Sequence, residues 1–197
     1  MKTFLLNLYF QFFAALARVY LKRQQPYVVG ITGSIWKTSC RMIVSEILTS
    51  NLKDKIVYTS SKNFNWELGM SLSILGISDY EPQLFSVLKT IYTSIQTSFF
   101  WDKLYDIIVL EYGIDHIWEM DFLLSIVKPD VGIVTKIDKV HSSQFANKDI
   151  TAQEKYKLLQ ATQSLSFLNF DDEYAKKFEN KISSHKKYYT TNNQLIN

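Results

Sequence analysis

This chain of 197 residues is 47% hydrophobic and 21% charged, which is typical of a folded globular protein and excludes a disordered one. Its net charge of +3 comes from dispersed lysines and is too small to predict a nucleic-acid-binding protein. The single cysteine, Cys40, excludes an internal disulfide framework and favours a cytoplasmic protein.

Residues 1–25 predict an apolar helix that precedes one folded domain over residues 26–197. Polar Asn7 and Gln11 interrupt its apolar run, which disfavours a membrane span. Three alternatives stay open: packing on the domain or on a partner, peripheral contact with a membrane surface through residues 4–21, or a signal peptide.

The segment Tyr27–Arg41, YVVGITGSIWKTSCR, predicts a strand, a phosphate-binding loop and the start of a helix. We expect Lys37 to bridge the terminal phosphates of ATP and the Thr38 hydroxyl to reach Mg²⁺. The residues expected around the nucleotide are Thr32, Gly33, Ser34, Ile35, Trp36, Lys37, Thr38 and Ser39. Such loops need glycine directly before the lysine, and this chain has Trp36 there.

Strand and helix patterns alternate along the rest of the chain. The predicted strands are Tyr27–Ile31, Lys55–Ser60, Asp106–Leu110, Val131–Thr135 and Leu165–Phe170. The predicted helices are 37–48, Trp66–Leu75, Glu81–Phe100, Ile117–Val127 and Asp149–Ala161, followed by a short helix and a polar tail. This order predicts an α/β fold, with a mostly parallel sheet flanked by helices and ligands at the carboxyl ends of its strands.

Several polar residues follow the predicted strands at that edge: Asn63, Asn65, Glu111, His141, Asp171 and Asp172. Glu111 comes after four apolar residues, so it is a natural Mg²⁺ ligand beside Thr38, or else a solvated loop acid. His141 is either a second ligand or a surface histidine. Lys155 shares a helix face with Ala152 and Leu159, so it is a candidate site lysine, or else a lysine that reaches solvent along the surface.

Five ordered motifs resemble the central ATPase domain of the Mur ligases. They are TGSIWKTS, SKNFNWELG, VLEYGIDHIWEM, KPDVGIVTKIDKVH and AQEK, and the resemblance runs from Tyr27 to Asp172. It implies an ATP-dependent ligase of peptidoglycan-precursor synthesis, in which ATP phosphorylates a carboxylate and an amine then forms an amide. The implied partners are a UDP-sugar-peptide and an amino acid or dipeptide, with greatest resemblance to the branch that adds D-alanyl-D-alanine.

The resemblance also implies roles for single residues. Lys37 would hold the phosphates, and Thr38, Glu111 and His141 would bind Mg²⁺. Lys155 matches a lysine that becomes carbamylated and so turns into an anionic metal ligand. The remaining implied contacts are those of Asn63 and Asn65 with substrate and γ-phosphate, and of Lys136 with the nucleotide, where the family has asparagine. The family's UDP-sugar-binding and C-terminal domains have no counterpart here, so we expect this chain alone not to complete ligation.

Two tryptophans, Trp36 and Trp118, stand at family glycine positions in a chain with only six glycines. Some bacteria read the codon UGA as glycine, whereas other genetic codes read it as tryptophan. One hypothesis is that Trp36 and Trp118, and as a third case Trp66, are glycines translated with the wrong code. The alternative is a real substitution, in which Trp36 fills the phosphate site of a catalytically inactive interaction module. A small-molecule kinase is a further rival, although it has no need of a carbamylated lysine.

Overall fold

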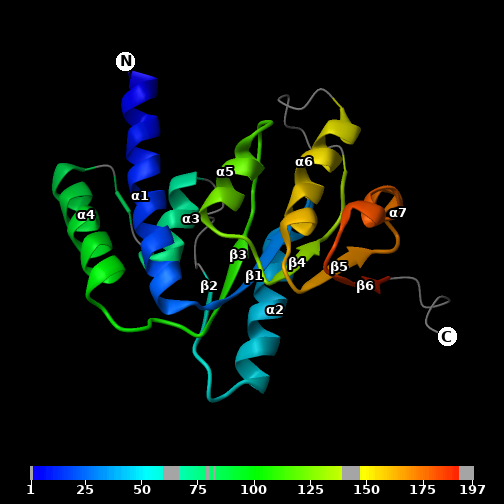
Figure 1. Cartoon of the computed structure of the whole chain (residues 1–197), viewed down its shortest axis with the longest axis horizontal. Helices are drawn as coiled ribbons and strands as arrows, with labels where there is room; N and C mark the ends of the chain where they lie inside the picture. Colours follow the sequence, from blue (N-terminus) through cyan, green and yellow to red (C-terminus); the bar gives the residue numbers. More distant parts are fainter. Residues whose placement is uncertain (1, 60–66, 79, 82, 139–146, 191–197) are drawn as a thin grey trace.

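The computed structural model describes residues 2–59, 67–78, 80–81, 83–138 and 147–190. Its centre is a parallel sheet with the strand order β2-β3-β1-β4-β5-β6 (Figure 1). The strands are β1 (Tyr27–Thr32), β2 (Val57–Thr59), β3 (Ile107–Glu111), β4 (Val131–Val134), β5 (Leu165–Asn169) and β6 (His185–Tyr189). The expected α/β fold is therefore confirmed.

Helices lie on both faces of this sheet, with α2 on one face and α1, α3, α5 and α6 on the other (Figure 1). Their bounds are α1 (Lys2–Gln24), α2 (Lys37–Asn51), α3 (Glu67–Ile74), α4 (Leu84–Phe99), α5 (Glu119–Ile126), α6 (Lys148–Ala161) and α7 (Glu173–Phe178), with a 3₁₀ turn at Glu179–Lys181. The sheet order reverses around β1, which has β3 on one side and β4 on the other. The carboxyl end of β1 is therefore the place where such folds form a binding crevice.

Alternate residues of β1 enter two different cores, as the two-residue period of a strand requires. Val28 lies in the core under α1, α3 and α5, together with Ile108 of β3. Val29 and Ile31 face the α2 side, where they meet Val109 of β3. Because both faces of the strand are buried, the sequence reads as a continuous apolar run.

The N-terminal helix α1 packs on the domain, and it contacts α3, α4 and α5. One side of the helix, which includes Phe13, Ala17 and Tyr20, is fully buried. This placement matches the packing alternative for the segment. Among the helices described, none is both long and apolar enough to cross a membrane.

The sequence expectation was wrong for β6, which we expected to lie in a polar tail. Its sequence, HKKYY, has no apolar run because the strand pairs only with β5 and is largely exposed. Several boundaries also differ from expectation: β2 begins at Val57 rather than Lys55, α4 begins at Leu84 rather than Glu81, and α2 continues to Asn51 rather than ending at residue 48.

Candidate functional site

The loop between β1 and α2 is held against the end of β4 by hydrogen bonds. The Ser34 amide donates to the Lys136 carbonyl at 2.7 Å, and the Thr135 hydroxyl donates to the Ile35 carbonyl at 2.6 Å. Gly33 has φ +149°, and a Cβ at this position would overlap the Thr135 hydroxyl. The close approach of the two segments therefore requires glycine here.

Lys37 is the first residue of α2, and its ammonium group stays near the loop. Its Nζ donates to the Ser34 carbonyl at 3.3 Å. Burial lowers the pKa of Lys37, against the opposing effect of Glu111 and Asp115. A partly desolvated cation at this place is suited to pair with an anionic ligand.

Thr38 and Glu111 come from different elements and meet at the N-terminus of α2. The Thr38 hydroxyl donates to Glu111 Oε2 at 3.0 Å, and Arg41 Nε lies 3.9 Å from the same oxygen. The Glu111 residue is only 5% exposed. A hydroxyl beside a buried carboxylate is a donor set that Mg²⁺ accepts, so the two residues fit the expected ion.

Lys155, on α6, is 3% exposed, so it is not a solvent-facing lysine. Burial lowers its pKa to about 7, and the charge of Lys37 adds to this effect, while Asp115, Glu111 and Glu119 oppose it. A large fraction of its amine is therefore uncharged near neutral pH. An uncharged amine is the form that reacts with carbon dioxide, as carbamylation requires.

The sequence analysis missed three carboxylates around the turn that follows β3: Asp115 in the turn, Glu119 at the start of α5 and Glu154 on α6. Glu119 accepts from the amides of Asp115, at 2.6 Å, and His116, at 2.8 Å. Glu154 of α6 accepts from the Trp118 amide at 3.3 Å. Asp115 could have been found from the sequence, because it lies four residues beyond Glu111 in the motif VLEYGIDHIWEM.

Three expected site residues, Asn63, Asn65 and His141, lie outside the described residues. Lys136 lies beside the loop, where its carbonyl accepts from Ser34 and its Nζ is 5.9 Å from the Trp36 ring. Within the described ranges, no cluster of three or more acidic, histidine or cysteine side chains could hold a metal. The binding of Mg²⁺ therefore stays a prediction.

The two acidic residues after β5 have local structural partners. Asp172 accepts from the amides of Ile137, at 2.6 Å, and Tyr174, at 3.0 Å, so it caps α7. The Thr190 hydroxyl donates to Asp171 at 2.6 Å.

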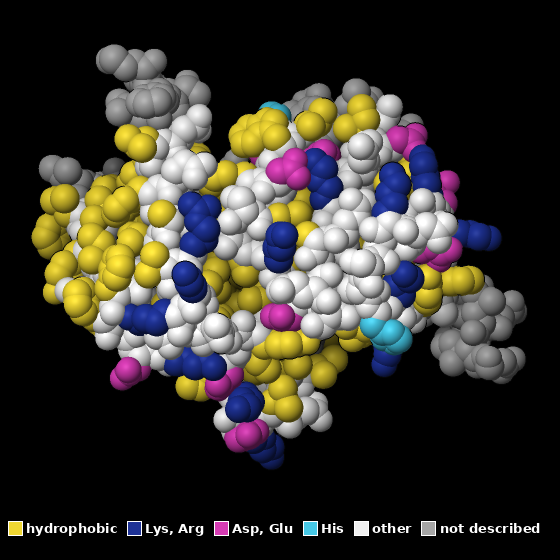
Figure 2. Space-filling view, in the orientation of Figure 1, with side chains coloured by type: hydrophobic (Ala, Val, Ile, Leu, Met, Phe, Trp, Pro, Cys, Tyr) yellow, Lys and Arg dark blue, Asp and Glu magenta, His cyan; other side chains and the backbone are white. Residues whose placement is uncertain are grey.

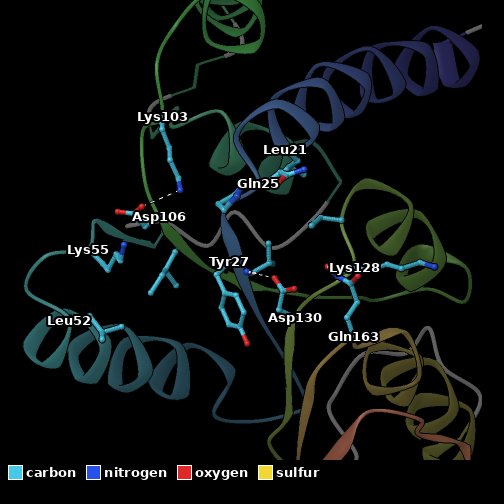
Figure 3. A pocket seen from close by; sticks show the side chains of 14 residues that line it. Leu21, Gln25, Tyr27, Leu52, Lys55, Lys103, Asp106, Lys128, Asp130 and Gln163 are labelled. Carbon is cyan, nitrogen blue, oxygen red and sulfur yellow. Dashed lines mark hydrogen bonds and ion pairs between the residues drawn. The ribbon is translucent and has the colours of Figure 1, made fainter.

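Two hollows lie near the sheet. An apolar groove of about 1060 Å³ runs along α2 and is lined by Trp36, Ser39, Ile43, Phe167 and Tyr189, among others. A second cavity, of about 650 Å³, lies at the amino ends of the strands (Figure 3). There Asp130 accepts from the Val28 amide at 2.8 Å, and Lys103 pairs with Asp106 at 3.1 Å. The second cavity therefore lies at the edge opposite the predicted site.

Comparisons with known proteins agree with this geometry. The family described as the Mur ligase middle domain matches residues 31–195. A UDP-N-acetylmuramoyl-tripeptide–D-alanyl-D-alanine ligase of Borreliella burgdorferi is 26% identical over 81% of this chain and 29% of its own length. The Bacillus subtilis ligase of the same name is 24% identical over 73% of this chain and 26% of its length.

Solved structures show the same fold. MurF from Acinetobacter baumannii has a TM-score of 0.68 and 19% identity, over 90% of this chain and 34% of that one. The MurF ligase from Thermotoga maritima in complex with ADP has a TM-score of 0.66 and 20% identity, over 92% and 36%. This chain thus spans just over a quarter of the curated relatives it matches.

Proposed function

Because this chain belongs to the Mur ligase middle-domain family, we propose that it is the ATP-binding part of a ligase of peptidoglycan-precursor synthesis. In the reaction, a carboxylate oxygen attacks the γ-phosphorus of ATP and ADP leaves. An amine nitrogen then attacks the acyl carbon, the C–O bond to phosphate breaks with its electron pair leaving on phosphate, and the nitrogen gives up one proton, so that an amide and phosphate remain. The observation that carries the proposal is the grouping of Lys37, the Thr38–Glu111 pair and Lys155 beside one loop.

The first turn of α2 would bind the phosphates of ATP. The first amides of any helix have no partner inside it and point out of its N-terminus, where they attract anions. Lys37 adds a cation there, and so neutralises charge that grows on the transferred phosphoryl group. Thr38 and Glu111 would hold Mg²⁺, which neutralises phosphate charge when it is bound.

Lys155 would contribute through its uncharged amine. The amine nitrogen attacks carbon dioxide, a C–N bond forms, and a proton leaves to give a carbamate. The neutral amine thus becomes an anionic carbamate, which attracts both the Lys37 ammonium and Mg²⁺. The low pKa of Lys155, about 7, supports this step because it leaves the amine free at neutral pH.

The substrates are proposed from the relatives' names. They are a UDP-N-acetylmuramoyl-tripeptide, which supplies the carboxylate, and D-alanyl-D-alanine, which supplies the amine. These substrates occur in the cytoplasm, which is the location we propose for this chain.

Calorimetric titration with ATP and Mg²⁺ tests the proposal. Lys37→Ala should weaken ATP binding at least about tenfold, because a charged phosphate contact is lost. The matched control is Lys53→Ala, at an exposed lysine beyond α2, which should leave the affinity unchanged. Both changes are also made in the Trp36→Gly chain, so that an indole in the loop does not hide binding. Equal affinity of the Lys37→Ala and Lys53→Ala chains contradicts the proposal.

The rival functions give different results in the same titration. Absence of ATP binding in both backgrounds favours the inactive interaction module. ATP binding that does not change when bicarbonate is added favours a kinase-like site, because such a site needs no carbamate. Stronger binding with bicarbonate in the parent, but not in Lys155→Met, supports the ligase.

We also propose that this protein binds peripherally to an anionic membrane surface. The supporting observation is an exposed apolar face on α1 and α4, which includes Leu8, Phe12, Phe85, Leu88 and Tyr92. Figure 2 shows hydrophobic side chains gathered over these helices, with lysine and arginine side chains beside them. Aromatic and basic side chains in this combination suit the headgroup region of a bilayer.

A further inference from the structure

Two tryptophans of this chain have a backbone conformation that favours glycine. Trp36 has φ +65° and Trp118 has φ +80°, both in the left-handed region. A bulky residue rarely adopts this conformation, because its Cβ approaches the neighbouring carbonyl oxygen too closely. Across the described part of the chain, Gln25 is the one other non-glycine residue with positive φ.

The other residue with positive φ, Gln25, is explained by its position at the end of a helix. It lies directly after α1, and its amide donates to the Leu21 carbonyl at 2.9 Å, so it closes the C-terminus of a helix. Left-handed residues are common at this position. Gly76, after α3, has φ +70° and serves the same purpose with glycine. Trp36 and Trp118, by contrast, stand at the start of helices.

Among the described residues, the contacts of the two tryptophan side chains are few: Lys136 Nζ lies 5.9 Å from the Trp36 ring, an exposed cation–π contact that offsets at most part of the strain. Trp36 precedes α2 and Trp118 precedes α5, and neither side chain makes a capping hydrogen bond. Trp36 is 61% exposed and Trp118 is 57% exposed, so little apolar surface is buried. What the fold uses at both positions is the backbone: the Trp36 carbonyl accepts from Cys40 at 2.9 Å and the Trp118 carbonyl from Phe122 at 3.1 Å.

We propose that positions 36 and 118 carry glycine in the protein as its own cell makes it. The two tryptophans then come from UGA codons that were read with a code assigning UGA to tryptophan. Backbone conformation and exposure at these two positions do not depend on the proposed ligase function. Both positions border the same site, so two independent substitutions to tryptophan there would both have to survive selection against backbone strain.

Glycine at these two positions would also change the chemistry of the loop. Glycine at position 36 leaves the backbone before Lys37 without a side chain, so a phosphate can approach the first amides of α2 closely. Glycine at position 118 keeps the amide that donates to Glu154 and removes an exposed indole. The site would then match the family pattern at both positions.

The codons of the source gene and the mass of the native protein test the proposal together. We expect UGA codons at positions 36 and 118. We also expect the peptides that span these positions to have masses that correspond to glycine, not tryptophan, at each one. Trp101 is the internal control, because it is not among the residues with positive φ and should be encoded by UGG. A UGG codon at 36 or 118, or a tryptophan mass in either native peptide, overturns the proposal.

A stability measurement tests the conformational basis independently of the source organism. Trp36→Gly and Trp118→Gly should each raise Tm by about 2–4 °C, because the strain of a left-handed bulky residue is relieved. Trp101→Gly should lower Tm or leave it unchanged, since glycine gains no conformational advantage there and is freer in the unfolded chain. A fall in Tm for Trp36→Gly and Trp118→Gly, as for Trp101→Gly, contradicts the inference.

Discussion

The surroundings of Lys155 determine the protonation state of its amine. In the unfolded chain its pKa is about 10.4, whereas burial and the neighbouring Lys37 lower the pKa to about 7 in the folded protein. Between these two values the unfolded state binds a proton that the folded state lacks. The free energy of unfolding therefore rises with pH over this range, by about 1.4 kcal/mol per pH unit at most.

Lys155→Met should remove this contribution. We expect Tm of the parent to rise from pH 7 to pH 9.5 more steeply than Tm of Lys155→Met, measured in buffers free of bicarbonate. Part of the slope remains in the variant, because burial also lowers the pKa of Lys37. Lys53→Met, at an exposed lysine, should keep the parent slope. Parallel curves for the parent and Lys155→Met would contradict a low pKa at position 155.

The placement of Lys37, Thr38 and Glu111 could be predicted from the sequence, although their roles stay proposals. Each follows a strand of a parallel sheet, and the carboxyl ends of such strands meet at one edge. The burial of Glu154 was not predictable. It lies one residue before Lys155 on the same helix, and a helical pattern does not predict that two adjacent charged residues are both buried. In the structure both are buried, at 4% and 3% exposure.

At the scale of elements, α1 is attached to the domain by one side of the helix. Phe13 is fully buried and packs edge-on against Tyr9 at a ring distance of 4.9 Å, whereas the adjacent Phe12 is 39% exposed. Two phenylalanines next to each other thus have opposite environments, as expected for a helix with one packed side. They make a matched pair for measuring how firmly α1 is docked.

Phe13→Ala should lower the free energy of unfolding by about 3–5 kcal/mol, because it leaves a cavity between α1 and the core. Phe12→Ala should lower it by about 1 kcal/mol or less. Urea denaturation followed by circular dichroism measures both values. Equal, small effects of the two changes would indicate that α1 is not docked in solution.

The elements that were easy to predict are those with a buried side. The strands β1 and β3 are buried at nearly every residue, so their apolar runs stand out. The edge strand β6 is exposed and pairs through its backbone, which leaves no pattern in its side chains. The start of α4 was placed too early because propensity alone locates a helix end poorly, and Gln83 makes no side-chain cap.

At the scale of the whole molecule, the candidate site and the exposed apolar face lie on different elements. The site surrounds the carboxyl end of β1 and the starts of α2 and α5, whereas the apolar face belongs to α1 and α4. α4 touches the rest of the domain chiefly through α1. A membrane bound to α4 would therefore leave the site open to nucleotide in solution.

Sedimentation with lipid vesicles distinguishes membrane binding through the α4 face from non-specific hydrophobic adsorption. Vesicles with anionic phosphatidylglycerol should bind this protein, and neutral phosphatidylcholine vesicles should bind it weakly, because Arg18, Lys22 and Arg23 lie on α1. Changing Phe85, Leu88 and Tyr92 together to Ser should reduce the bound fraction at least about tenfold, since these side chains are 82%, 57% and 65% exposed on α4. The matched control changes Met42, Ile43 and Ile47 of α2 to Ser, where exposure is 62%, 59% and 55%.

Two outcomes contradict the proposed membrane surface. An equal loss of binding in both triple variants would mean that exposed apolar area alone is responsible. Failure of the parent to bind either kind of vesicle would mean that it has no such surface.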